Sequence, residues 1–322
     1  MSPNMLRWVD EPEIQRLTLQ IFGDRIPVDF ERAGDSISTL VYRLSRGEET
    51  FYLRILPEVG DSFAPEAYVH TLLRRHGVHV PEVIYLEHRN DVLQRSVMVT
   101  TEVRGRSVDH RPMDKATVNI LMEAGRDLAV INSIPVEGFG WIKRDRSAVD
   151  RLEAEQASNR AFLLEGLDHC LRVLGGTVLT PHKARRIRDL VSEQSVWLDI
   201  GQGSLAHGDF DVTHIYQENE CYTGIIDFGE IRGSDPYYDL GHFRLHDREI
   251  APYEALPSLL AGYRQVASLP PDYEQRFAFL SLLIGIRFLA RSVQKLTAHE
   301  LSEHTRLHAR TSIERDLELL RD

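Results

Sequence analysis

The chain has 322 residues, of which 42% are hydrophobic and 27% are charged, and its formal net charge is −11. This composition is typical of a folded globular protein long enough for two lobes, and the negative charge argues against nucleic acid as a partner. With only two cysteines, a disulfide framework is not expected. The N-terminus is charged and so does not resemble a signal peptide, and the apolar runs are too short to cross a bilayer. We therefore expect a cytoplasmic protein.

The first hundred residues predict a small antiparallel sheet with flanking helices. Two runs that alternate apolar and polar residues flank a polar turn at Gly47, which is typical of a β-hairpin. Pro65 and Gly77 mark the expected start and end of the helix that follows. In chain order, the expected elements are a helix at 12–22, strands at 39–44 and 50–56, a helix at 64–77, and strands at 80–87 and 95–103.

From Gly105 onward the sequence predicts a mainly helical lobe. Pro135 ends one long amphipathic stretch, and Thr180 followed by Pro181 is typical of a helix N-terminus. We therefore expect an α+β fold of two lobes, a sheet-rich lobe at 1–103 and a larger helical lobe at 104–322. The expected helical stretches are 115–134, 149–174, 180–198 and, beyond a short β pair, the chain from about Tyr253 to its end.

The segment from Leu205 to Phe243 interrupts these helices with acidic residues beside apolar strands. It contains "HGDFDVTH", "IIDFGE" and "GSDPYYDLG". A carboxylate in apolar surroundings is costly unless it is paired, hydrogen-bonded or bound to a metal. One aspartate in a loop and a second at the end of a buried strand suit a magnesium–phosphate site. Mg²⁺ prefers oxygen ligands, and the other carboxylate can accept the proton of an attacking hydroxyl.

In this order and at these separations, the three motifs resemble those of the aminoglycoside phosphotransferase and choline-kinase-like family. The resemblance covers nearly the whole chain, because the expected order of the lobes agrees with it. It implies a protein-kinase-like fold, ATP or GTP as co-substrate, and Mg²⁺. It also implies that Asp209 is the catalytic residue that positions the acceptor hydroxyl and that Asp227 binds the metal. Asp239 and His207 would support the catalytic loop.

The family also has a basic residue on its third strand, held by a helix glutamate, that binds the α- and β-phosphates. No lysine precedes Lys115 in this chain. The resemblance therefore assigns these two roles to Arg54 and Glu66, as in the hygromycin-phosphotransferase-like branch, where arginine takes this place. The alternative for Arg54 is a surface charge on an edge strand.

Two further segments of the first lobe are expected to contact the nucleotide. The hydroxyl groups of Ser36 and Ser38 lie in the turn expected to cover the phosphates, although this segment is equally compatible with an ordinary turn. Backbone groups from Thr101 to Val103, where the two lobes join, are expected to bind the edge of the purine.

Several polar residues near the motifs have competing interpretations. His214 stands where the family has Asn, and we expect it to face the metal directly or through water; Mn²⁺ is then an alternative to Mg²⁺. The alternative is that His214 only hydrogen-bonds the loop. Asp211 and Asp235 are interpreted as turn residues. His242 and His246 lie four apart on an expected helix and are interpreted as a pair on the helix surface.

The leading hypothesis is a small-molecule kinase that moves the γ-phosphoryl group of ATP or GTP to a hydroxyl of an aminoglycoside-like compound, amino sugar or amino alcohol. The alternative is a nucleotide-binding pseudokinase with a regulatory or scaffold role, suggested by the missing lysine and the missing Asn. A metal-dependent hydrolase using His207, Asp209 and His214 would need further metal ligands. Expected partners are the nucleotide and the acceptor, without nucleic acid or membrane; the oligomeric state stays open.

Overall fold

The computed structural model describes residues 9–24, 27–33, 39–176, 178–294 and 303–321. The chain forms two compact units. The first unit contains residues 1–104 and 143–152, and the second contains residues 105–142 and 153–322. Among the described residues, no helix combines the length and the apolarity that crossing a membrane requires.

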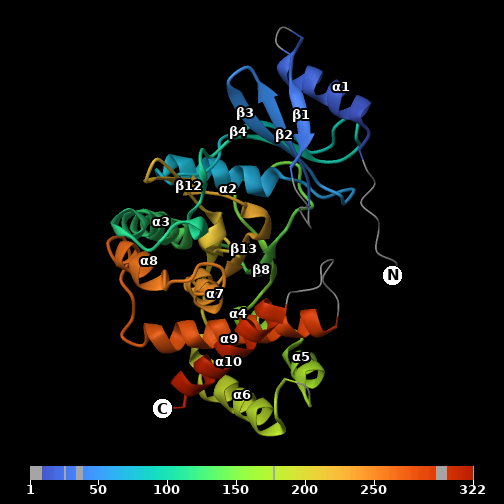
Figure 1. Cartoon of the computed structure of the whole chain (residues 1–322). Helices are drawn as coiled ribbons and strands as arrows, with labels where there is room; N and C mark the ends of the chain where they lie inside the picture. Colours follow the sequence, from blue (N-terminus) through green and yellow to red (C-terminus); the bar gives the residue numbers. More distant parts are fainter. Residues whose placement is uncertain (1–8, 25–26, 34–38, 177, 295–302, 322) are drawn as a thin grey trace. The chain divides into compact units, whose positions relative to one another are not determined.

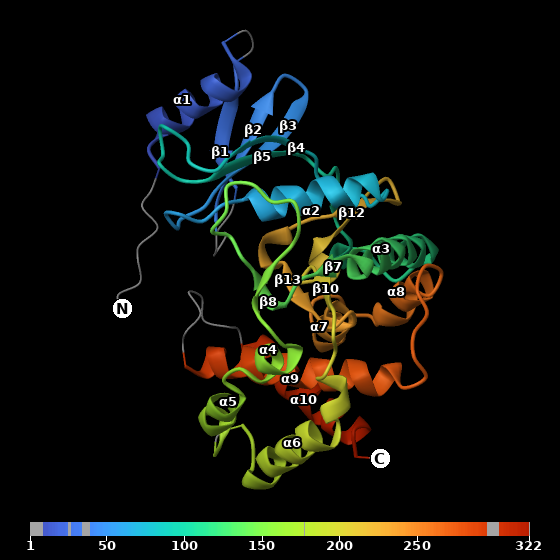
Figure 2. The ribbon, with the colours of Figure 1, turned by 180° about the vertical axis from the view of Figure 1, so that it is seen from behind.

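The first unit is built on a five-stranded antiparallel sheet in the order β1-β2-β3-β5-β4 (Figures 1 and 2). The hairpin is formed as predicted, and Gly47 in its turn has a φ of +61°, which favours glycine. Ile14 and Leu17 of α1 pack against buried side chains of the sheet. The elements are α1 (Glu11–Phe22), β1 (Asp29–Arg32), β2 (Leu40–Arg46), β3 (Glu49–Ile55), α2 (Ala64–Arg75), β4 (Val83–Glu87) and β5 (Val97–Thr101).

The first unit also includes the segment 143–152, which the predicted division at 103/104 gives to the second lobe. The backbone N–H of Ser62 donates to the carbonyl of Arg144 over 2.8 Å, and the Tyr68 hydroxyl donates to the carbonyl of Asp150 over 2.9 Å. These hydrogen bonds attach the segment to α2 and to the loop before it. In Figure 2 this segment is the light green loop beside α2.

The second unit is mainly helical, and α9 runs through its core (Figure 1). Apolar side chains from the surrounding helices pack on both sides of α9, which explains why its residues 277–286 are almost all apolar and buried. The helices are α3 (Lys115–Ser133), α4 (Asn159–Leu164), α5 (Leu167–Leu174), α6 (Pro181–Glu193), α7 (Tyr238–His246), α8 (Leu256–Tyr263), α9 (Tyr273–Val293) and α10 (Glu303–Leu319).

Two small sheets accompany these helices, with the strand orders β7-β10-β13-β8-β9 and β12-β11-β6. The pair β11 and β12 is the short β pair expected from the sequence, and it connects two of the three motifs. The strands are β6 (Arg106–Ser107), β7 (Pro135–Val136), β8 (Phe139–Ile142), β9 (Ala154–Gln156), β10 (Gly203–Ala206), β11 (Ile215–Glu218), β12 (Cys221–Ile225) and β13 (Arg232–Ser234).

The helical stretch predicted at 149–174 is wrong in its first half. Residues 154–156 form β9 and pair with β8, and α4 begins only at Asn159, where the Ser158 hydroxyl accepts the N–H of Ala161 over 3.1 Å. Gly166, with a φ of +68°, separates α4 from α5. The prediction for α6 is confirmed, since the Thr180 hydroxyl accepts the N–H of Lys183 over 3.2 Å.

Candidate active site

The loop at 207–211, between β10 and a 3-10 turn at Val212–His214, is held by one buried carboxylate. Asp239, in the first turn of α7, is fully buried. Its Oδ2 accepts the backbone N–H of His207 and the side-chain amide of Asn132, and its Oδ1 accepts the N–H of Gly208, each over 2.8 Å. Hydrogen bonds to a carboxylate are about twice as strong as those between neutral groups, so this geometry supports a loop-holding role for Asp239.

His207 joins the same loop to the end of β12. Its Nε2 donates to the carbonyl of Ile226 over 2.8 Å, and its Nδ1 accepts the N–H of Asp209 over 3.4 Å. Burial and the neighbouring His214 lower the pKa of His207, so the ring is neutral at neutral pH, with one donor and one acceptor. His207 therefore ties the backbone at Asp209 to the segment that leads into Asp227.

Gly208 allows a close approach that no other residue would permit. Its φ is +92°, and an added Cβ would lie 2.0 Å from the carbonyl oxygen of Glu230 and 2.5 Å from Nε of Arg232. Arg232 itself lies over the ring of Trp141, with its guanidinium carbon 4.3 Å from the ring centroid, and donates to the Tyr238 hydroxyl over 2.9 Å. The loop is thus packed tightly against β13.

Asp209 presents a half-exposed carboxylate, with 48% of its side chain accessible. Burial opposes its ionisation, but the three neighbouring histidines, when protonated, outweigh this effect and hold the pKa of Asp209 below its usual range. The predicted surface pair of His242 and His246 is wrong: His242 is only 7% exposed, because α7 packs against α9, and its Nε2 lies 3.4 Å from Oδ1 of Asp209.

Asp227 and His214 lie side by side at the ends of the β11–β12 pair. Asp227 has φ and ψ of +65° and 65°, a conformation that non-glycine residues rarely adopt and that often marks functional sites. Its Oδ2 is 3.9 Å from Nε2 of His214, and 54% of its side chain is exposed. The buried Nδ1 of His214 has no hydrogen-bond partner among the described residues, although Oδ1 of Asp211 is 3.7 Å away.

Of these two side chains, Asp227 could offer a carboxylate to Mg²⁺, whereas the imidazole of His214 suits a softer divalent cation such as Mn²⁺ better. Across the residues that the structure describes, no group of three or more histidine, cysteine or acidic side chains is placed to hold a metal ion. Mg²⁺ does not need such a group, because it keeps several waters and binds through one or two carboxylates together with the phosphates of a substrate. A hydrolase site with a full set of protein ligands is not supported.

Arg54 lies on β3 in the middle of the first unit's sheet, opposite Val41 of β2 and Met98 of β5. The alternative of an edge-strand charge is therefore wrong. Its guanidinium forms an ion pair with Glu66 of α2, and the two side chains are 11% and 1% exposed. Burial would raise the pKa of Glu66, but Arg54, His70 and Arg144 lower it to about 2.

Two further basic side chains near Glu66, those of His70 and Arg144, were not found from the sequence. Nε2 of His70 is 3.8 Å from one carboxylate oxygen of Glu66, and Nη2 of Arg144 is 4.0 Å from the other. His70 follows Glu66 by one helical turn, so the spacing alone contained a signal. Arg144 lies in the returning segment 143–152, for which the local sequence contains no signal.

Of the remaining nucleotide contacts predicted in the first unit, only those of Thr101 and Val103 fall on described residues. Ser36 and Ser38 lie outside the described residues. The backbone N–H of Thr101 donates to the carbonyl of Glu82 over 2.9 Å, and the Thr101 hydroxyl accepts the N–H of Glu82 over 2.9 Å. The N–H of Thr101 is thus engaged within the unit, and any recognition of the purine edge by a backbone N–H here falls to Val103.

Asp211 and Asp235 have the local roles predicted for them. Oδ1 of Asp211 accepts the N–H of Thr213 over 2.7 Å, and Oδ1 of Asp235 accepts the N–H of Tyr237 over 2.8 Å. Both are side-chain caps of turns. Burial raises the pKa of Asp235 to about 6.

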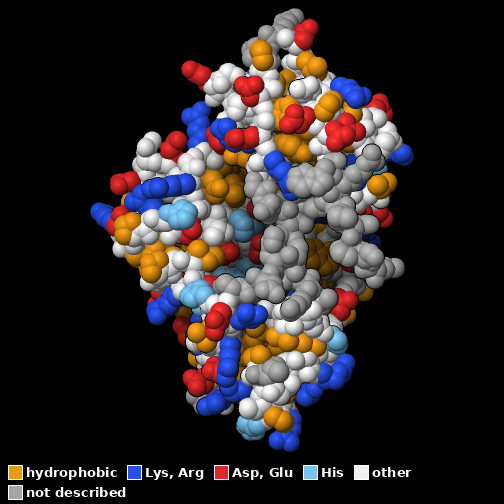
Figure 3. Space-filling view, turned by 45° about the vertical axis from the view of Figure 1, so that its right-hand side comes forward, with side chains coloured by type: hydrophobic (Ala, Val, Ile, Leu, Met, Phe, Trp, Pro, Cys, Tyr) orange, Lys and Arg blue, Asp and Glu red, His pale blue; other side chains and the backbone are white. Residues whose placement is uncertain are grey.

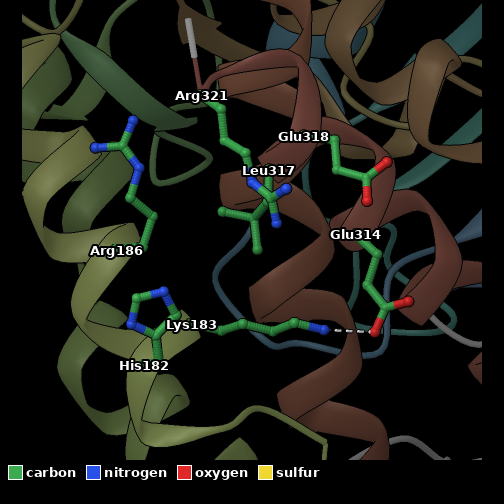
Figure 4. A pocket seen from close by; sticks show the side chains of 7 residues that line it. All are labelled: His182, Lys183, Arg186, Glu314, Leu317, Glu318 and Arg321. Carbon is green, nitrogen blue, oxygen red and sulfur yellow. Dashed lines mark hydrogen bonds and ion pairs between the residues drawn. The ribbon is translucent and has the colours of Figure 1, made fainter.

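A surface pocket of about 350 Å³ lies between α6 and α10, away from the motifs (Figure 4). Two of its basic side chains are paired: Lys183 reaches Glu314 over 2.7 Å, and Arg186 binds Glu193 and the carbonyl of Leu320. On the helical part of the face in Figure 3, basic and acidic side chains are likewise interspersed. Neither feature indicates a second binding site. The pocket is lined by His182, Lys183, Arg186, Glu314, Leu317, Glu318 and Arg321.

Solved structures with the same fold include the aminoglycoside phosphotransferase APH(4)-Ia, with a TM-score of 0.69 and 16% identity over 96% of this chain and 99% of that chain. A thermostable mutant of it, in ternary complex with ADP and hygromycin B, has a TM-score of 0.68 and 16% identity over 95% and 98%. A proposed fructosamine-3-kinase from Thermobifida fusca has a TM-score of 0.62 and 17% identity over 94% and 98%. No curated protein matches the chain.

These similarities confirm the kinase-like fold. The model of the phosphotransferase enzyme family matches residues 29–279, a range that contains Arg54, Glu66 and all three motifs of the second unit. This match confirms two predictions made from the sequence: that the protein is an enzyme, and that it resembles this phosphotransferase family. A chain with this fold, with Asp209 on a loop held by Asp239, and with a family match over most of its length belongs to the phosphotransferase enzyme family.

Proposed function

We propose that this phosphotransferase moves the γ-phosphoryl group of ATP or GTP to a hydroxyl group of a small molecule. The observation that carries the proposal is the buried Asp239, which accepts two backbone N–H groups of the loop that presents the ionised, half-exposed Asp209. A preorganised carboxylate of this kind orients an acceptor hydroxyl and accepts its proton. The complex of a structural relative with ADP and hygromycin B supports an adenine nucleotide as the donor.

Each unit contributes separate groups to this activity. In the first unit, the guanidinium of Arg54, fixed by Glu66, would bind phosphate oxygens of the nucleotide. In the second unit, Asp227 and His214 would hold a divalent cation, which neutralises phosphate charge when it is bound. Asp209 holds the proton removed from the acceptor. No side chain has to form a covalent intermediate.

The acceptor proposed is an amino sugar, an aminoglycoside-like compound or an amino alcohol. Support comes from the aminoglycoside and fructosamine enzymes among the structural relatives and from the net charge of −11, which favours a cationic substrate. A pseudokinase is less favoured, because a scaffold would not need an ionised Asp209 on a supported loop.

A screen of nucleotide turnover tests the proposed function. We expect ATP or GTP consumption to rise at least about tenfold above the acceptor-free rate with one class of aminated hydroxyl compound. The panel should contain aminoglycosides, hygromycin-like compounds, choline, homoserine and amino sugars, and mass spectrometry should show addition of one phosphoryl group. Nucleotide binding without transfer to any acceptor would favour the pseudokinase instead.

The metal role of His214 is tested by replacing it with Asn. An amide oxygen suits Mg²⁺, whereas an imidazole nitrogen suits Mn²⁺ better, so His214→Asn should raise the ratio of the Mg²⁺ rate to the Mn²⁺ rate by roughly three- to tenfold. Initial rates should be measured at saturating nucleotide with each metal. An unchanged ratio would mean that His214 only supports the loop. His182→Asn, far from the motifs on α6, is the matched control.

A further inference from the structure

A buried histidine of α7 lies directly beside the proposed base. Nε2 of His242 is 3.4 Å from Oδ1 of Asp209, and only 7% of the histidine is exposed. Gly241 lets α7 approach α9 closely, because a Cβ at this position would lie 2.6 Å from the Cβ of Leu280. Since the helix is fixed against the core in this way, His242 is fixed against Asp209.

The other ring nitrogen determines where the hydrogen atoms of His242 lie. Nδ1 is 3.2 Å from the carbonyl oxygen of Phe210, and since a carbonyl only accepts, Nδ1 carries a hydrogen. Nε2 then faces Asp209 with a lone pair in the neutral ring, or with an N–H in the imidazolium. Its 3.4 Å separation from Oδ1 exceeds the range of about 2.7–2.9 Å for a charge-assisted hydrogen bond, as expected for two acceptors without a proton between them.

The surrounding charges also favour a neutral His242 before the reaction. Burial and His246 lower the pKa of His242 to about 4, although Asp209 and Asp211 act in the opposite direction. The ring of His246 is 4.7 Å away, and its Nδ1 is 2.6 Å from Oε2 of Glu249. Burial lowers the pKa of His246 and Glu249 raises it, with a net increase. A proton that arrives on the carboxylate of Asp209 therefore meets the free lone pair of Nε2, which lies 3.4 Å from Oδ1.

We propose that His242 is a positioning residue that acts through Asp209 and receives the proton that Asp209 removes from the acceptor hydroxyl. This role rests on the proposed function. As the acceptor oxygen bonds to phosphorus and the bond from phosphorus to the nucleotide oxygen breaks, the hydroxyl proton passes to the Asp209 carboxylate. After a half-turn of this half-exposed group about its Cβ–Cγ bond, the proton passes to Nε2 of His242. The imidazolium, hydrogen-bonded at both nitrogens, releases the proton to water between turnovers.

The pairing is tested without an activity assay, by nitrogen-15 NMR of the histidine side chains in the full-length protein. We expect a neutral His242 ring with its hydrogen on Nδ1 at neutral pH and a titration near pH 4. In Asp209→Asn this titration should move to lower pH, because the carboxylate that raises the pKa of His242 is lost. A neutral ring with its hydrogen on Nε2, or a titration indifferent to Asp209→Asn, would overturn the proposal.

The role in transfer is tested with His242→Gln and His242→Ala. We expect kcat to fall roughly 10- to 100-fold while KM for either substrate changes by less than about twofold, since the lost interaction forms only during the reaction. Added imidazole should restore much of the rate of His242→Ala. Pyrazole, a ring of the same size but a much weaker base, should not. His182→Ala is the control and should keep the wild-type rate.

The outcomes separate the two proposals. Absence of transfer by the wild type refutes the proposed function itself. Full kcat in His242→Gln beside an active wild type overturns only the role of His242, and equal rescue by pyrazole and imidazole does the same, because the ring would then merely fill space. If His242→Ala does not fold, as judged by circular dichroism, the glutamine variant and the NMR titration still decide.

Discussion

Replacing Asp209 by Asn is expected to lower phosphoryl transfer by roughly 10²–10⁴-fold, because the amide cannot accept the hydroxyl proton. Nucleotide affinity should stay within about twofold of the wild type, since the proposed contact of this side chain is with the acceptor and not with the nucleotide. The backbone of the loop should persist, because its supports come from Asp239 and His207. Initial rates and a nucleotide titration, measured on the same preparations, check both parts.

The matched control is Asp199→Asn, which removes an exposed aspartate that pairs with Arg160 over 2.7 Å. Such surface pairs contribute little, so this variant should transfer at the wild-type rate. Full turnover by Asp209→Asn would remove this residue from the mechanism and with it the main support for the proposed function.

Replacing Arg54 by Met should destabilise the first unit by roughly 3–5 kcal/mol, the cost of leaving a buried charge without its partner. Glu66 is 1% exposed, and only His70 and Arg144 would remain near it. Hydrogen exchange of the amides in β3 and α2 measures the loss locally, with α9 as an internal reference. Nucleotide binding should weaken as well, because Arg54 is the proposed phosphate ligand.

Glu66→Gln tests whether the two side chains act as a pair. This substitution removes the buried charge. The loss of stability in the double variant with Arg54→Met should therefore be smaller than the sum of the losses in the two single variants. Strict additivity, in stability and in nucleotide affinity, would contradict the pair.

The lowered pKa of Glu66 predicts that the stability of the first unit depends on pH. The pKa of Glu66 is lowered from 4.5 to about 2 in the folded unit, so its contribution is fully present above pH 4.5 and is lost as the pH falls toward 2. Urea unfolding followed by circular dichroism across this window should show a steeper loss of stability in the wild type than in Glu66→Gln. Equal slopes would mean that Glu66 is not ionised in the folded protein.

Local sequence signals predict much of this fold, but not its long-range pairings. The hairpin, α2, α3 and α6 lie within a few residues of the predicted positions, because alternation, proline, glycine and capping residues mark them locally. Residues 154–156 were misassigned to a helix, because their apolar spacing fits a helix until the partner strand β8 is known. The spacing of apolar residues within a short segment does not show whether that segment pairs with a strand far away in the chain.

In the candidate site, too, the residues marked by local sequence were predicted, and those placed by long-range packing were not. Asp209, Asp227 and Asp239 were found because each lies in a contiguous motif. His242 was interpreted as a surface residue, although it is buried beside Asp209, since the helix face that packs inward depends on α9. The roles of Asn132 and Arg144 likewise follow only from contacts between elements far apart in the chain.

The returning segment 143–152 has a consequence for the synthesis of the protein. When residue 104 leaves the ribosome, the first unit still lacks the carbonyl of Arg144 that accepts the N–H of Ser62, the carbonyl of Asp150 that accepts the Tyr68 hydroxyl, and one of the cations beside Glu66. Domains usually fold in order from the N-terminus as they emerge. The first unit includes residues 143–152, which follow α3 and β8 of the second unit in the chain. The first unit therefore cannot finish folding before part of the second unit has been synthesised.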